Sequence, residues 1–208
     1  MSNKFIITIG RQFGSGGREI GKKIADHYGI KYYDKELIAL AAKESGFCEN
    51  VFEKADEAPS NSFLYSLVMG SNSMSSLFFR NDDLLTNDKL FSIQSNVIKN
   101  IAKENSCVIV GRCSDYILRD EENLMRVYLH ADDDFRIKRI MELYNLSEKE
   151  AKNSIVKADK KRNNYYNYYT GNEWTGLTNY DLIINTSKFG IDNAVKSIIS
   201  NINMLYNK

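Results

Sequence analysis

Phe5-Ile6-Ile7-Thr8-Ile9-Gly10 runs directly into Arg11-Gln12-Phe13-Gly14-Ser15-Gly16-Gly17-Arg18-Glu19-Ile20-Gly21, near the amino terminus of the chain. Its first part is an apolar run too short to cross a membrane, which is typical of a buried strand. The closely spaced glycines that follow mark a turn. After the turn, Ile20, Ile24 and Ala25 recur with helical spacing. The stretch therefore predicts a strand, a glycine-rich loop and a helix.

A loop of this kind is suited to anion binding. Gly14, Gly16 and Gly17 let backbone N–H groups approach a ligand without a Cβ in the way. The positive end of the helix that begins near Arg18 adds to the attraction for negative charge. We therefore expect a phosphate group to bind here. The alternative is a glycine-rich turn that serves close packing alone.

The loop departs from the standard phosphate-loop pattern, G-x-x-x-x-G-K-[ST]. When Gly14-Ser15-Gly16 is aligned with that pattern, Gly17 stands where the lysine belongs and Glu19 where the Ser or Thr belongs. We interpret the stretch as a degenerate phosphate loop. Arg18 is the first candidate to replace the lysine, and Arg11 is the second.

Length and charge narrow the class of protein. The chain has 208 residues, of which 43% are apolar, enough for one domain with a substantial core. The 28 basic and 27 acidic residues nearly cancel, so no overall field draws the chain to nucleic acid or to anionic lipid. Any recognition of phosphate must be local.

The cysteines and the amino-terminal residues suggest a compartment. Cys48, Cys107 and Cys113 lack metal-ligand spacing, which fits a reducing cytosol better than a disulfide framework. No basic leader with an apolar stretch precedes the first strand, and no run of about 18 apolar residues occurs. We expect a soluble cytoplasmic protein. With only His27 and His130 present, a histidine-based triad or metal site is not expected.

Strand and helix patterns alternate along most of the chain. We expect further strands over residues 30–33, 107–111, 124–131 and 181–185, and helices over 18–28, 34–46, 87–104, 114–118 and from 132, 147 and 191 onward. Residues 47–85 give a weaker signal, which we interpret as helical or partly ordered. This alternation predicts an α/β fold, with three α/β/α layers around a five-stranded parallel sheet.

Two other segments are expected to place charged side chains near the expected phosphate site. Arg112 follows Gly111 at the end of an apolar strand, and ligands of open α/β sheets gather at such carboxyl ends. The helix opened by the capping box at Ser147 is so polar that we expect a projecting flap. It passes into the tyrosine-rich run of residues 163–169. We expect these tyrosines to pack against the core, and the alternative is that they stack on a base.

Taken together, these blocks resemble the cytidylate kinase-like family of nucleoside monophosphate kinases. The resemblance rests on residues 9–20, on Val110-Gly111-Arg112, on residues 127–131 followed by Arg136 and Arg139, and on Asp159-Lys160-Lys161-Arg162 before residues 180–187. It implies one phosphate-loop kinase domain over residues 1–208, with a helical insertion on the acceptor side at 34–85 and a lid at 132–179. It also implies ATP and Mg²⁺ as cofactors, and transfer of the γ-phosphoryl group to a nucleoside monophosphate or a related small metabolite.

Roles for individual residues follow from the resemblance. The donor phosphates would be held by the loop residues Gly14, Ser15, Gly16, Gly17, Arg18 and Glu19. The acceptor would be bound by Asp34, Arg112, Asp115 and Lys161, and charge in the transition state would be neutralised by Arg18, Arg112, Arg136, Arg139 and Arg162. Glu19 is the candidate magnesium ligand. Cys113 stands where the family has an Asp, which leaves Asp115 as the nearest carboxylate.

Two other functions stay open. One is a nucleotide- or anion-binding protein that keeps the kinase fold without catalysis, since the lysine and the hydroxyl of the loop are replaced. The other is an RNA-binding module that uses residues 157–169, which balanced overall charge disfavours. Apolar residues within 47–85 make a homodimer possible, and neither a membrane nor an extended nucleic acid is expected as a partner.

Overall fold

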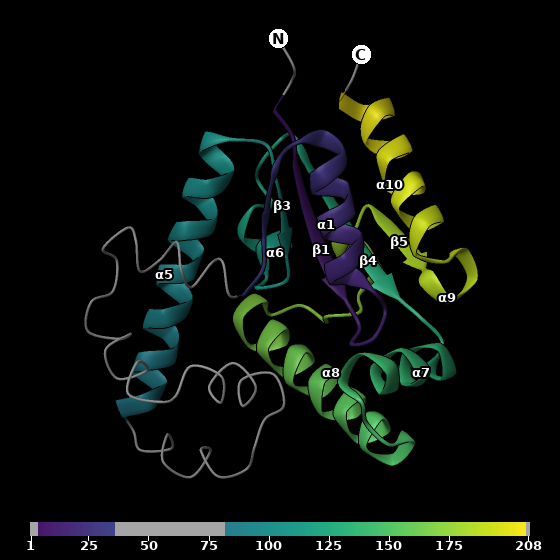
Figure 1. Cartoon of the computed structure of the whole chain (residues 1–208). Coiled ribbons are helices and arrows are strands. Elements are labelled where there is room, and N and C mark those ends of the chain that lie inside the picture. Colours follow the sequence, from purple (N-terminus) through teal and green to yellow (C-terminus); the bar gives the residue numbers. More distant parts are fainter. Residues whose placement is uncertain (1–3, 36–81, 207–208) are drawn as a thin grey trace.

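The structure, a computed structural model, describes residues 4–35 and 82–206 (Figure 1). The helix expected over residues 34–46 and most of the expected insertion at 34–85, including the apolar residues on which a homodimer would rest, lie outside the described residues. So does Cys48. The division of the chain into core, insertion and lid stays a prediction.

Five parallel strands form one sheet in the order β2-β3-β1-β4-β5. Their bounds are Ile6–Arg11 for β1, Lys31–Tyr33 for β2, Cys107–Val110 for β3, Leu124–His130 for β4 and Leu182–Asn185 for β5. The central strands β1 and β3 pair in register from Ile6 opposite Cys107 to Ile9 opposite Val110. Both are buried along nearly their whole length, as expected for strands covered on two faces.

Helices cover both faces of the sheet (Figure 1). On one face, α1 (Gly17–Tyr28) and α10 (Ile191–Tyr206) pack their apolar stripes on the side chains of Ile7, Ile9 and their neighbours. On the other face, α5 (Asp82–Glu104) and the short α6 (Ser114–Ile117) pack on Ile6 and Ile109. The predicted three-layer α/β/α class with a five-stranded parallel sheet is confirmed.

Two further helices, α7 (Asp133–Tyr144) and α8 (Glu148–Thr170), lie past the carboxyl ends of the strands, the lower end of the sheet in Figure 1. The capping box predicted at Ser147 is present, because Ser147 and Glu150 bond each other's backbone N–H groups. After α8 the chain makes a 3₁₀ turn, η1 (Leu177–Asn179), and a short helix, α9 (Thr186–Phe189).

The prediction that the polar helix projects as a flap is wrong for the second half of α8. Tyr166 is buried in the core, and Tyr169 stacks on Phe91 of α5 with ring centroids 4.0 Å apart. The aromatic residues that follow, Trp174 and Tyr180, are also buried. Because polar residues such as Asn167, Asn172 and Glu173 stand between these rings, the average polarity of the segment hid its anchors. The prediction that its tyrosines pack against the core is confirmed for Tyr165, Tyr166 and Tyr169, whereas Tyr168 is exposed.

Other boundaries agree closely with the predictions. The helix expected from residue 87 begins at Asp82, and the strands end within one residue of their expected limits. Both histidines lie outside the core, with His27 exposed on α1. Within residues 4–35 and 82–206, no helix combines the length and apolar character needed to cross a lipid bilayer.

Candidate functional site

The glycine-rich loop joins the end of β1 to the start of α1. Gly14 and Gly16 have φ angles of +86° and +84°, a region that side chains with a Cβ rarely adopt. A Cβ on Gly14 would also lie 3.0 Å from the carbonyl oxygen of Arg136. Gly16 is the N-cap of α1, and no side chain caps the helix. The first-turn N–H groups therefore keep their capacity to bind an anion.

A cavity of about 260 Å³ opens beside this loop. Its lining combines Gly14, Gly16 and Gly17 of the loop with the end of β3 and with residues of α7 and α8. Seven arginine and lysine side chains border it: Arg11, Arg18, Lys35, Arg112, Arg139, Lys161 and Arg162. Aromatic side chains form another part of the wall: Phe13, Tyr144, Tyr165, Tyr166, Trp174 and Tyr180. The site thus combines positive charge with flat apolar surfaces.

Arg112 is placed in the cavity by an unusual turn after β3. Gly111, Arg112 and Cys113 have consecutive positive φ angles of +81°, +61° and +55°. Such a conformation costs energy for residues other than glycine, and it is found where surrounding structure holds a functional side chain in place. The guanidinium of Arg112 lies 5.5 Å from the ring centre of Tyr165, within range of a cation–π interaction.

The cationic side chains of the cavity affect one another. Burial, together with the proximity of Arg162, Arg18 and Arg112, lowers the pKa of Arg11 to about 9. Burial also lowers the pKa of Arg162, although the carboxylate of Asp159 opposes this. Burial and the nearby Arg112 lower the pKa of Lys161. Each of these shifts means that positive charge is unfavourable here, and a bound anion would reverse that.

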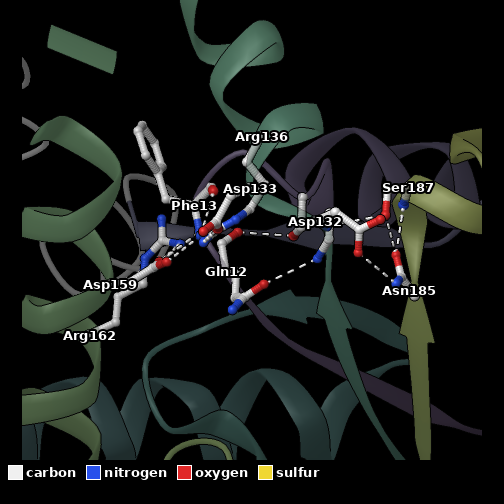
Figure 2. A network of polar contacts seen from close by, with 11 residues as sticks. Gln12, Phe13, Asp132, Asp133, Arg136, Asp159, Arg162, Asn185 and Ser187 are labelled. Carbon is white, nitrogen blue, oxygen red and sulfur yellow. Dashed lines mark hydrogen bonds and ion pairs between the residues drawn. The ribbon is translucent and has the colours of Figure 1, made fainter. Parts of the chain in front are cut away.

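Asp159 of α8 is the centre of a polar cluster that ties α7 and α8 to the loop (Figure 2). It accepts a hydrogen bond of 2.7 Å from the backbone N–H of Phe13, and Arg136 donates to it over 2.5 Å. Arg136 is buried and also pairs with Asp133. Arg162 lies 3.8 Å from Oδ1 of Asp159, the oxygen that accepts from Phe13, and donates to the carbonyl of Arg11. We refer to Phe13, Asp133, Arg136, Asp159 and Arg162 as the Asp159 cluster.

Glu19 lies between two cations. Arg139 donates to one of its oxygens over 2.5 Å, and Lys23 lies 3.3 Å from the other. These partners lower the pKa of Glu19 although its partial burial acts in the opposite direction. No group of three or more His, Cys, Asp or Glu side chains able to hold a metal ion occurs among the residues the structure describes.

The two acceptor-side carboxylates differ in setting. Asp115 is buried, and burial raises its pKa even though the Tyr166 hydroxyl donates to it over 2.6 Å. Asp34 accepts from the Tyr32 hydroxyl and lies 3.6 Å from Nε of Arg18. Asp115 lines the cavity, whereas Asp34 does not and instead contacts Arg18, which lines it.

Most of the residues chosen from the sequence are brought together. The cavity lining includes the following: Gly14, Gly16, Gly17, Arg18, Glu19, Arg112, Asp115, Arg139, Lys161 and Arg162. Three do not line it. Ser15 is fully buried behind the loop, where its hydroxyl donates to the carbonyl of Gln12. Arg136 lies in the Asp159 cluster, and Asp34 contacts Arg18, which does line the cavity.

Comparison with known proteins gives the family. The profile of the Cytidylate kinase-like family matches residues 6–188, most of the chain. The chain belongs to the cytidylate kinase-like family.

Relatives of this family are distant in sequence. A cytidylate kinase of Pyrococcus horikoshii is 29% identical over 205 residues, covering 96% of this chain and 91% of its own length. Among solved structures, an uncharacterized protein from Eubacterium ventriosum is 32% identical with a TM-score of 0.72, over 96% of this chain and 99% of that one. Shikimate kinase from Bacteroides thetaiotaomicron has a TM-score of 0.52 at 16% identity, covering 96% and 98%. That last likeness concerns the fold alone.

Sequence reasoning gave too little weight to three parts of the site in this cytidylate kinase-like chain. Arg11 was only a second candidate, although it directly follows Gly10 at a strand end. Asp159 was noted within a charged run, and nothing local shows that it bonds Phe13, 146 residues earlier. Trp174 and Tyr180 lie in a segment without periodicity. Of the three, only the position of Arg11 at the carboxyl end of β1 offered a usable signal.

Proposed function

We propose that this cytidylate kinase-like protein is a phosphotransferase that moves the γ-phosphoryl group of ATP to a nucleoside monophosphate or a related small metabolite. One observation carries the proposal. The cavity joins an uncapped helix N-terminus to arginines from β1, the turn after β3, α7 and α8, which is an arrangement suited to several phosphate groups at once.

The donor phosphates would lie against the loop from Gly14 to Glu19. Its backbone approaches the cavity at Gly14, Gly16 and Gly17, and the positive end of α1 faces the same space. Ser15 contributes through its backbone, because its side chain is turned inward to Gln12.

The acceptor would occupy the side of the cavity bordered by Arg112, Asp115 and Lys161. Arg112 can bind a phosphate through two N–H groups, a geometry that lysine lacks. Tyr165, Tyr166, Trp174 and Tyr180 offer flat surfaces for a ring. Asp34 would act on the acceptor through Arg18, since it does not itself reach the cavity.

In the reaction, the bond from the γ-phosphorus to the oxygen bridging to the β-phosphate breaks, and a bond to an acceptor phosphate oxygen forms. ADP leaves with the bridging oxygen. Because the attacking oxygen is already ionised, no general base is needed, and positioning with charge neutralisation carries the rate. Arg18, Arg112, Arg139 and Arg162 border the space where that charge develops. Arg136 would contribute by fixing Asp159, which in turn positions Phe13 and Arg162.

Magnesium is implied by the family, and Glu19 is the candidate protein ligand. Its carboxylate oxygens are of the kind that Mg²⁺ prefers, but both lie against the cations Arg139 and Lys23. The described residues therefore do not form a ready-made metal site. The ion would bring its charge with the phosphates.

A coupled assay of ADP release tests the proposal, with CMP, dCMP, UMP, AMP and GMP as acceptors, each with and without Mg²⁺. We expect at least one acceptor to raise ADP release above the ATPase background. Arg112→Ala should lower kcat/KM for that acceptor by about 10³-fold, since it removes a guanidinium that faces the transferred group. The control is Arg119→Ala, an exposed arginine that packs on Tyr116 outside the cavity and should leave turnover unchanged. Equal turnover by Arg112→Ala and the wild type would refute the assignment.

The second candidate is a nucleotide-binding protein without catalysis. It is favoured by the replacement of the loop lysine and hydroxyl with Gly17 and Glu19, and by the ion pairs that engage Glu19. Calorimetric binding of ATP together with no ADP release for any acceptor would support it over the transferase.

A further inference from the structure

The place that a phosphate-loop lysine would use is taken by a different side chain in this protein. Gly17 stands at the lysine position, as the first residue of α1. A Cβ atom on Gly17 would lie 2.7 Å from Cγ and 2.8 Å from Cβ of Arg11. Carbon atoms that are not bonded to each other pack at about 3.5–4.0 Å. The stem of Arg11 and a side chain at position 17 therefore exclude one another.

From Gly17, the Arg11 side chain continues across the mouth of the loop to the turn after β3. A Cβ atom on Gly111 would lie 2.0 Å from Nη1 and 2.9 Å from Cζ of Arg11, so a side chain there would collide with the guanidinium. Gly17 and Gly111 thus leave room for Arg11 at both ends of its side chain. Because Gly111 precedes Arg112, the Arg11 guanidinium lies between the donor loop and the proposed acceptor arginine.

The surroundings of this guanidinium indicate an absent anion. An arginine that serves packing is normally paired with carboxylates when it is taken out of water. Within the described part of the chain, no carboxylate lies at ion-pair distance from Arg11, and its charged neighbours are Arg162, Arg18 and Arg112. Arg18, the other candidate, has a side chain that is 53% exposed and lies beside Asp34.

We propose that Arg11 is the phosphate-binding cation of this loop, and that its side chain replaces the missing lysine by crossing the space above Gly17. The identity of the ligand as a nucleoside polyphosphate rests on the proposed function. The lowered pKa of Arg11, caused first by burial and then by the neighbouring arginines, agrees with this role, since a bound phosphate would favour its charged form.

The geometry suggests an exchange experiment. Arg11→Gly removes the cation and frees the space. The double variant Arg11→Gly/Gly17→Lys returns a cation from the standard position. The matched control, Arg11→Gly/Gly17→Ala, fills the same space without charge, and Arg119→Ala removes an arginine elsewhere. Each variant is titrated with ADP and with inorganic tripolyphosphate by calorimetry, and its thermal midpoint is recorded.

We expect Arg11→Gly to weaken binding of both ligands by about 10- to 100-fold, the range for one charge-assisted contact. Arg11→Gly/Gly17→Lys should recover most of the lost affinity. The control Arg11→Gly/Gly17→Ala should bind as weakly as Arg11→Gly, and Arg119→Ala should bind as tightly as the wild type. Unchanged binding by Arg11→Gly, or equal recovery with Ala and Lys at position 17, would overturn the proposal. If Arg11→Gly does not fold, Arg11→Met keeps the stem beside Gly17, removes the charge, and carries the same comparison.

Phosphoryl transfer is measured in parallel so that two failures stay distinct. If the wild type transfers phosphoryl groups but Arg11→Gly binds tripolyphosphate as tightly as the wild type, the role of Arg11 is refuted and the proposed function stands. Arg11-dependent binding of tripolyphosphate without transfer to any acceptor would do the reverse.

Discussion

Arg136 and Arg11 both contact the glycine-rich loop, but their surroundings are opposite. Arg136 is buried against the carboxylates of Asp133 and Asp159 and donates to a backbone carbonyl as well. Arg11 has arginines as its charged neighbours. A buried charge with its partners in place holds structure together, whereas a half-buried charge among like charges is stabilised when a ligand of opposite sign binds. Arg136 is therefore a structural cation of this site, whereas Arg11 is the cation that we propose to face a ligand.

The largest expected effect on folding tests the structural side of this comparison. Arg136→Met keeps the packing beside Gly14 but leaves Asp159 without its shortest contact, so we expect the free energy of unfolding to fall by about 3 kcal/mol. Urea denaturation followed by circular dichroism measures this loss. Arg11→Met is the matched variant and should change stability by less than about 1 kcal/mol, since it also removes repulsion. Equal losses in the two variants would break the distinction.

A second prediction tests the ligand side. Inorganic tripolyphosphate at a hundred times its dissociation constant should stabilise the wild type by about 2.7 kcal/mol and raise its thermal midpoint. The rise should shrink as salt is added, because the attraction is largely electrostatic. Differential scanning fluorimetry follows both effects. Stabilisation of the same size in Arg11→Met would show that the cation cluster does not depend on Arg11.

The smallest expected effect concerns Asp115, the buried carboxylate of the cavity. Burial raises its pKa above the ordinary value, so between the two values the folded state binds more protons than the unfolded state. This contribution makes wild-type stability decline as pH rises from about 4 through the raised pKa. Asp115→Asn keeps an oxygen that can accept from Tyr166 and should remove that decline. Urea midpoints between pH 4 and pH 7 measure it.

The result for Asp115 also bears on the cavity cations. If Asp115 were their carboxylate partner, its pKa would be lowered and wild-type stability would rise with pH over the same range. If wild-type stability declines with rising pH and the decline disappears in Asp115→Asn, then Asp115 is not the carboxylate partner of Arg11 and Arg112. The proposed anion site requires this result.

The sheet was predictable because its strands are continuous apolar runs ending at glycine or polar residues, as in 107–111. The position of Arg112 beside the cavity was predictable for the same reason, since the end of a strand fixes where the next residues lie. The pairing of Asp159 with Phe13 and Arg136 depends on how α7 and α8 dock, and no local pattern encodes it. Likewise, the sequence shows only that Gly17 replaces the lysine of the phosphate-loop pattern. The position of the Arg11 stem in the structure shows that a side chain at position 17 is excluded.

The hydrogen bond from the backbone N–H of Phe13 to Asp159 crosses from the loop to α8 and joins residues far apart in the sequence. Its proton is therefore a single-site reporter of whether α8 is docked. In a ¹⁵N-labelled sample, the rate at which this amide exchanges with deuterium would measure how often α8 leaves the loop. The same signal, followed during an ADP titration, would separate nucleotide entry from helix movement in real time.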